Sequence, residues 1–76
     1  MNYNLKNIAM QVTVEQVKRV NNSKLGNPRY ELVTELGNYK TAPNAGWVYG
    51  VNFENLVNKT VLIDLDGRGN ITRIEV

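Results

Sequence analysis

The amino-acid sequence predicts a small, mainly β domain of five antiparallel strands, with one short helix between the third and fourth strands. Two observations predict this class: apolar and polar residues alternate in several segments, and residues that favour turns separate those segments. The chain has 76 residues, which is the length of one domain with a modest core. We therefore expect a single domain over residues 1–76, in which residues 1–7 form a loose N-terminal arm.

The first strand is expected to be long and bent. Apolar and polar residues alternate from Met10 to Glu15, as in a strand with one buried face. Val17 and Val20 do not continue this alternation, and a slip of one residue would turn every later side chain to the other face of the sheet. A β-bulge absorbs such a slip. The sequence therefore predicts a bulge near Glu15–Gln16.

A loop and a tight hairpin are expected on either side of the second strand. Residues 21–28 read as a loop, and the second strand begins at Arg29, with its even-numbered residues facing the core. Gly37 and Asn38 tolerate positive φ and predict a two-residue hairpin turn. This register would form three favourable cross-strand pairs: Leu36 with Tyr39, Glu35 with Lys40, and Thr34 with Thr41.

A short helix is expected after the third strand. Pro43 ends that strand, and Asn44 can cap a helix over Ala45–Tyr49. Gly50 suits the left-handed position just beyond the helix. Residues 53–59 are then expected to form a connection.

The last third of the chain predicts a second hairpin. Residues 60–65 are β-branched and apolar, and the inward-facing set is expected to be Val61, Ile63 and Leu65. The sequence DGRGN, residues 66–70, makes the turn, and residues 71–76 alternate as the final strand.

This order of elements matches a five-stranded barrel of the OB type better than an SH3-like barrel, which is the alternative. In either barrel the helix would plug one end with Trp47, Val48 and Val51.

The composition favours a protein without catalytic activity or a cofactor. The chain contains no cysteine and no histidine, so the commonest nucleophile, general base and transition-metal ligands are missing. The N-terminal sequence lacks the apolar run of a signal peptide, and no segment approaches the length of a membrane span. We therefore expect a cytoplasmic protein with no membrane partner. The formal net charge is only +2, so the distribution of charge matters more than its sum.

Residues 25–52 carry a recognisable pattern: GNPRY, then a glycine-containing hairpin leading into YKT, then N-A-x-x-x-Y-G-V. This pattern resembles a family of small uncharacterised bacteriophage proteins, in which GNPRF, TxxGxYxT and D-A-x-x-x-Y-G-I stand at the same places. Asn44 replaces the usual aspartate. The resemblance implies a phage or prophage origin, hence action in the host cytoplasm, and it implies no activity.

The segment from Asp64 to Glu75 has the spacing of a calcium-binding loop. Counted from Asp64, carboxylates stand at positions 1, 3 and 12 and a glycine at position 6, as in an EF-hand. The oxygen-bearing residues are Asp64, Asp66, Asn70 and Glu75. However, position 5 is the cation Arg68, and the preceding TVLI favours a strand over an entering helix. A β-hairpin explains the same residues, so we expect no metal.

Basic residues form the first candidate binding site. No acidic residue lies between Gln16 and Tyr30, and in an OB-type barrel this region would lie next to the last hairpin loop. Such loops and the face between them bind single-stranded nucleic acid, although Glu31 and Glu35 on the second strand would repel phosphates. The simpler alternative is a solvated basic loop. The candidate residues are Lys18, Arg19, Lys24, Arg29, Lys40 and Arg68.

Two aromatic residues form the second candidate site, for a protein partner. Trp47 and Tyr49 point to opposite sides of a helix, so one of them should be exposed. If Tyr49 is the exposed one, Tyr49 with Phe53 would make a contact for a protein. The first strand or the last, ending at Val76, could also offer an edge to a second copy as a homodimer.

These observations lead to one functional hypothesis and two alternatives. The leading hypothesis is a non-catalytic, phage-encoded accessory protein that binds a host macromolecule, for which a host protein is favoured, and acts as an anti-defence or host-takeover inhibitor. The first alternative is a module that binds single-stranded nucleic acid or a nucleotide. The second alternative is a small component of the virion.

Overall fold

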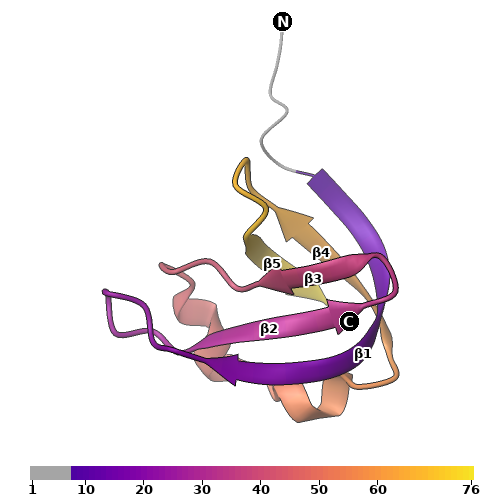
Figure 1. Ribbon diagram of the computed structural model, residues 1–76, viewed down its shortest axis with the longest axis horizontal. Coiled ribbons are helices and arrows are strands. Elements are labelled where there is room, and N and C mark those ends of the chain that lie inside the picture. The colour runs from indigo at the N-terminus through magenta and orange to yellow at the C-terminus, as the bar shows by residue number, and fades with distance from the viewer. Residues whose placement is uncertain (1–7) are drawn as a thin grey trace, which may run out of the picture.

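The structure is a computed structural model that describes residues 8–76, and the N-terminal arm expected for residues 1–7 lies outside the described residues. It is mainly β and contains one five-stranded sheet, which confirms the predicted class. Figure 1 shows the strands and two short 3₁₀ helices. Their bounds are β1 Ile8–Val20, β2 Arg29–Thr34, β3 Gly37–Lys40, η1 Gly46–Gly50, η2 Phe53–Leu56, β4 Thr60–Leu65 and β5 Ile71–Glu75.

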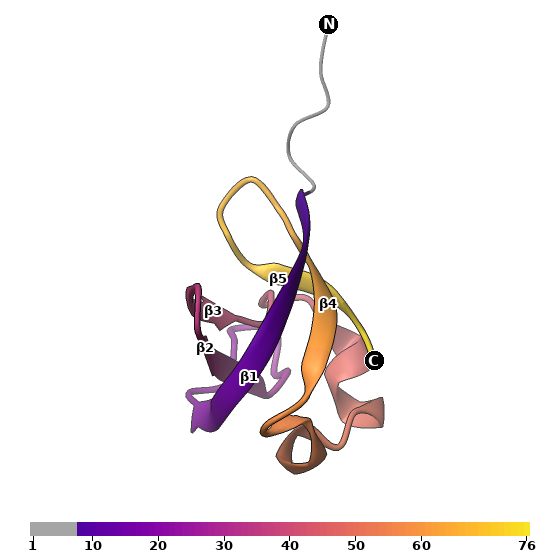
Figure 2. The ribbon, with the colours of Figure 1, turned by 90° about the vertical axis from the view of Figure 1, so that its right-hand side faces the viewer.

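The strand β1 is shared by the two parts of the sheet. The strand order is β3-β2-β1-β4-β5, and all neighbouring strands are antiparallel. Residues 8–13 of β1 pair with β4, and the residues from Val14 onward pair with β2. The register shifts between Val14 and Gln16, which confirms the predicted bulge. Figures 1 and 2 show β1 curving from one part of the sheet to the other.

The two edges of the sheet meet at a single place. Thr41, just after β3, forms an isolated parallel bridge with Ile71 at the start of β5. The N–H of Ala42 donates to the carbonyl oxygen of Ile71 at 2.9 Å. Two segments that are 30 positions apart in the sequence (41 and 71) therefore lie side by side.

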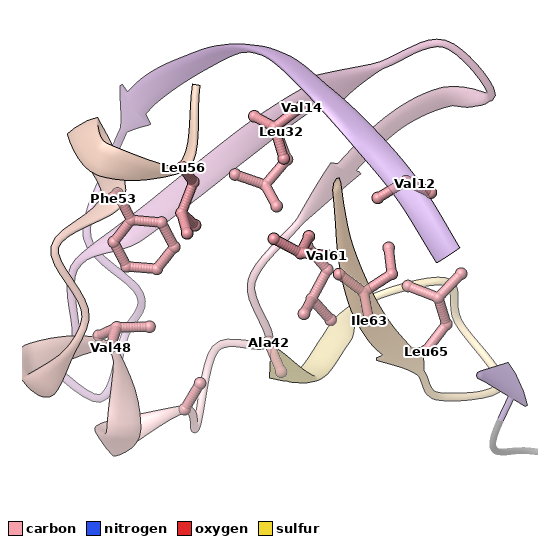
Figure 3. Close-up of a cluster of buried hydrophobic side chains, with 12 residues drawn as sticks. Val12, Val14, Leu32, Ala42, Val48, Phe53, Leu56, Val61, Ile63 and Leu65 are labelled. Carbon is pink, nitrogen blue, oxygen red and sulfur yellow. The ribbon is translucent and has the colours of Figure 1, made fainter. Parts of the chain in front are cut away.

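The core lies between the sheet and the two 3₁₀ helices. Val61, Ile63 and Leu65 are buried, as predicted for the inward set of β4. Figure 3 shows these side chains beside Val12 and Val14 of β1, with residues from η1 and η2 at the other end of the cluster. Of the three predicted plug residues, Val48 is buried, whereas Trp47 and Val51 pack against the core and remain partly exposed.

The predicted register of the β2–β3 hairpin is wrong. The structure pairs Leu32 with Tyr39 and Glu31 with Lys40, so the turn consists of residues 35 and 36. Leu36 is consequently 56% exposed. The physical reason is the hydroxyl of Thr34, which donates to the carbonyl of Gly37 at 2.7 Å and accepts the N–H of Leu36 at 3.1 Å.

The predicted helix is also different. Residues 46–50 form a 3₁₀ helix rather than an α-helix, and the side chain of Asn44 does not cap it. Glycine at both ends of GWVYG disfavours a longer α-helix. Gly50 does not adopt the left-handed backbone conformation that was expected. The helix ends instead at Val51, which is extended and whose N–H donates to the carbonyl of Val48. The expected connection contains a second 3₁₀ helix, η2.

Candidate binding surface

The loop between β1 and β2 is folded by its own hydrogen bonds. The hydroxyl oxygen of Ser23 accepts the N–H groups of Leu25 and Asn27, each at 3.2 Å. Backbone bonds of 2.9 Å join Ser23 to Asn27 and Gly26 to Ser23, and Gly26 takes a φ of 88°, which favours glycine. The loop is therefore held in one shape, and that shape leaves the side chain of Leu25 70% exposed.

The same loop is attached to the segment that contains η1. The hydroxyl of Tyr49 donates to the carbonyl of Gly26 at 3.3 Å, and the side-chain amide of Asn27 donates to the carbonyl of Pro43 at 3.0 Å. Figure 1 shows the β1–β2 loop beside η1 at one end of the molecule. Tyr49 is 70% exposed although its hydroxyl is bonded.

We call Lys24, Leu25 and Tyr49 the loop-end surface, because all three are exposed and the Tyr49–Gly26 bond joins the two segments that carry them. The sequence indicated that either Trp47 or Tyr49 is exposed, and in the structure Tyr49 is the exposed one. Leu25 was missed. The available signal was an isolated leucine in the otherwise polar loop NNSKLGNP.

The structure does not bring Phe53 to this surface. Phe53 is 4% exposed, and its ring stacks on that of Tyr30 with the centroids 4.0 Å apart and the planes 15° from parallel. The 3₁₀ turn of η2 directs Phe53 and Leu56 into the core. The expected pair of Tyr49 and Phe53 is therefore corrected: Tyr49 is accessible to a partner and Phe53 is not.

Two of the predicted basic residues bond groups of the protein itself. The guanidinium of Arg19 lies 5.6 Å from the centroid of the Tyr30 ring and also donates to Asn22 and to a backbone carbonyl. Arg29 donates from Nε to the carbonyl of Thr41 at 2.9 Å and from Nη2 to Oδ1 of Asn70 at 3.3 Å. Arg29 thus connects the start of β2 to the end of β3 and to the β4–β5 turn.

The other basic candidates do not form one continuous patch. Lys18 and Lys40 lie on the strands that flank β2, and both stand opposite Glu31 in the register, so an acidic residue lies between them. Arg68 is in the β4–β5 turn, which Figures 1 and 2 both show apart from the β1–β2 loop. Lys24 is the basic candidate on the loop-end surface.

The residues of the calcium-like spacing bond protein groups instead. Oδ1 of Asp66 accepts the N–H groups of Arg68 and Asn70, each at 2.9 Å. The guanidinium of Arg73 lies 3.9 Å from Asp64 and 3.2 Å from Glu75. Within residues 8–76 no group of three or more acidic side chains is gathered in a metal-binding arrangement.

No enclosed pocket is present in the part of the chain that the structure describes. In residues 8–76 there is also no helix with the length and apolar character needed to cross a membrane. Comparisons of the chain with protein-family models, with curated proteins and with solved structures found no match.

Proposed function

We propose that this chain is a non-catalytic binding protein, a phage-encoded accessory protein that attaches to a host protein in the host cytoplasm and blocks it. The observation that carries the proposal is the loop-end surface. There, Leu25 and Tyr49 are each 70% exposed, yet the loop and η1 that bear them are fixed by hydrogen bonds.

The chemistry of the surface fits a protein partner. Large apolar and aromatic side chains at the centre of a contact supply much of the binding energy of protein interfaces. A contact that is already ordered loses less conformational entropy on binding. Here the hydrogen bonds of Ser23 order the loop, and the hydrogen bond of Tyr49 orders its ring. The loop and the ring therefore each lose less conformational entropy when a partner binds.

The alternative partner is single-stranded nucleic acid, and the fold gives it some support. The strand order, together with the parallel bridge between Thr41 and Ile71, is consistent with an OB-like barrel that closes between β3 and β5. Against it, Arg19 and Arg29 bond protein groups, and Lys18 and Lys40 share Glu31. A phosphate chain needs several available cations along its path, so we favour the protein partner.

The test is a pull-down from a lysate of the bacterial host, with and without nuclease. The tagged wild type is compared with Leu25→Ser, with Tyr49→Ala, and with Leu36→Ser as a matched control in an exposed turn. We expect one protein to be retained after nuclease treatment, to be lost with the first two variants, and to be retained by the control. Loss of all partners with nuclease, together with oligonucleotide binding that weakens steeply with salt, would favour the nucleic-acid alternative.

A further inference from the structure

The strand β5 has one free edge. It pairs with β4 on one side, and on the other side the carbonyl of Ile71 accepts the N–H of Ala42. Within residues 8–76, no further backbone hydrogen bond reaches β5 from that side. An exposed strand edge carries unpaired N–H and C=O groups and can pair with another strand.

The alternation of backbone bonds across the sheet shows which groups of β5 face this edge. Val14 donates its N–H to Lys59 beside β4, whereas the N–H of Thr13 points the other way, to Glu35. The even-numbered residues at the start of β1 therefore bond β4. In the observed register these residues lie opposite odd-numbered residues of β4, which therefore bond β1. The even-numbered residues of β4 direct their backbone N–H and C=O groups to the other side of the strand and bond β5.

On β5 the result is a free N–H and a free C=O at Ile74. Leu62 lies opposite Glu75 and Asp64 lies opposite Arg73, so Arg73 and Glu75 direct their backbone groups to β4. Ile74, between them, directs its N–H and C=O to the free edge. The side chains of Arg73 and Glu75 are on the solvent face, 63% and 56% exposed.

We propose that the β5 edges of two copies of this chain pair antiparallel about a two-fold axis at Ile74, joining two sheets into one. In this register Arg73 of each copy faces Glu75 of the other, so the same ion pair forms twice. Ile74 faces its own counterpart on the inner face. The pairing ends at Arg73, because the register of β5 shifts between Asp64 and Leu65 of β4 and leaves Thr72 as an extra residue. Val76 is 80% exposed in the single chain and would lose exposed apolar surface on pairing. This inference does not depend on the proposed function, because the loop-end surface is formed by the β1–β2 loop and η1 and not by β5.

The occupant is a second copy because the charges along this edge complement themselves. The other edge strand of the sheet, β3, has the sequence GNYK, with Lys40 as its only charged residue. Pairing of β3 with itself would bring no opposite charges together. Arg73 also bonds Asp64 and Glu75 within the chain, which holds its guanidinium on the face where the second Glu75 would lie.

The test is the molar mass measured by sedimentation velocity over a concentration series from micromolar to millimolar. We expect the wild type to shift from monomer to dimer, and Arg73→Glu to weaken the dimer about tenfold, because two attractive pairs become repulsive. The double variant Arg73→Glu with Glu75→Arg should restore the dimer. Lys40→Glu, a matched charge reversal on β3, should leave it unchanged.

A backbone variant provides a second readout. Ile74→Pro removes the N–H that faces the carbonyl of Ile74 in the second copy but takes no hydrogen bond from the β4–β5 pair, and it should also weaken the dimer. Circular dichroism of each variant checks that the monomer is folded. A wild type that remains monomeric at every concentration would overturn the proposal, and so would a dimer that Arg73→Glu and Ile74→Pro both leave intact.

Discussion

The β2–β3 and β4–β5 hairpins use the same local chemistry in different surroundings. In each hairpin a polar side chain at or just after the end of the first strand accepts one or two backbone N–H groups of the turn. In the β2–β3 hairpin this residue is Thr34, which is buried and both donates and accepts. In the β4–β5 hairpin it is Asp66, which is partly exposed and accepts two N–H groups.

The comparison shows that the side chain bonded to the turn determines where the chain reverses. Gly37 and Gly69 both have positive φ, 143° and 81°. Gly69 lies inside its turn, whereas Gly37 is the first residue after its turn and belongs to β3. A glycine therefore marks a hairpin without giving its register, and the bonded side chain gives the register.

The largest expected difference between the hairpins comes from removing one hydroxyl from each. Thr34→Val should lower the free energy of unfolding by about 2 kcal/mol, because a buried site loses two hydrogen bonds. Thr72→Val is the matched change in the other hairpin, where a half-buried hydroxyl bonds the carbonyl of Asp64 at 3.3 Å. It should cost about 0.5 kcal/mol. Chemical denaturation of both variants measures the difference.

Equal losses of unfolding free energy in Thr34→Val and Thr72→Val would contradict the view that burial makes the hydroxyl of Thr34 the more important one.

The register of the β2–β3 hairpin has a separate check by nuclear magnetic resonance. Nuclear Overhauser contacts should join Leu32 to Tyr39 across the hairpin. Contacts between Leu36 and Tyr39 as a cross-strand pair would instead support the register expected from Gly37–Asn38.

The parts of the fold that follow from side-chain alternation could be predicted from the sequence. The inward set of β4 and the bulge in β1 are both consequences of the period of two, which the sequence displays directly. The β2–β3 register could not be predicted in this way. Thr34 fits a strand and a turn equally well by residue type, and its role depends on the hydrogen bonds that its hydroxyl makes.

The candidate site was less predictable than the fold. Helical geometry indicated that either Trp47 or Tyr49 is exposed, without deciding which. Burial of Phe53 depends on η2, which the sequence did not predict. Leu25 was missed because its exposure depends on the bonds of Ser23. Glu31 stands opposite both Lys18 and Lys40, which can be seen only when the β1–β2 and β2–β3 registers are known. A list of basic residues therefore overstated the extent of the basic patch.

The second prediction compares the two glycines. Gly37→Ala should destabilise the protein by about 1.5 kcal/mol, because positive φ strains alanine. In addition, the new methyl group would lie 3.4 Å from the hydroxyl of Tyr39. Gly69→Ala should cost about 1 kcal/mol, since a Cβ there meets no atom within 4 Å. Thermal unfolding of the two variants side by side shows which of them loses more stability. A larger loss of stability in Gly69→Ala would argue against a destabilising contact between the new methyl group and the hydroxyl of Tyr39.

A smaller effect than at Thr34 is expected at Asp66, because its turn is open to water. Asp66→Ala removes the acceptor of two N–H groups that solvent can partly replace, and it should lower the free energy of unfolding by about 1 kcal/mol. Asp66→Asn keeps a side-chain oxygen at the same position and should be close to the wild type. Urea denaturation of the pair distinguishes a hydrogen-bonding role from a charge role. If the asparagine variant is as unstable as the alanine variant, the negative charge rather than the acceptor geometry holds this turn, and the two hairpins do not share one mechanism.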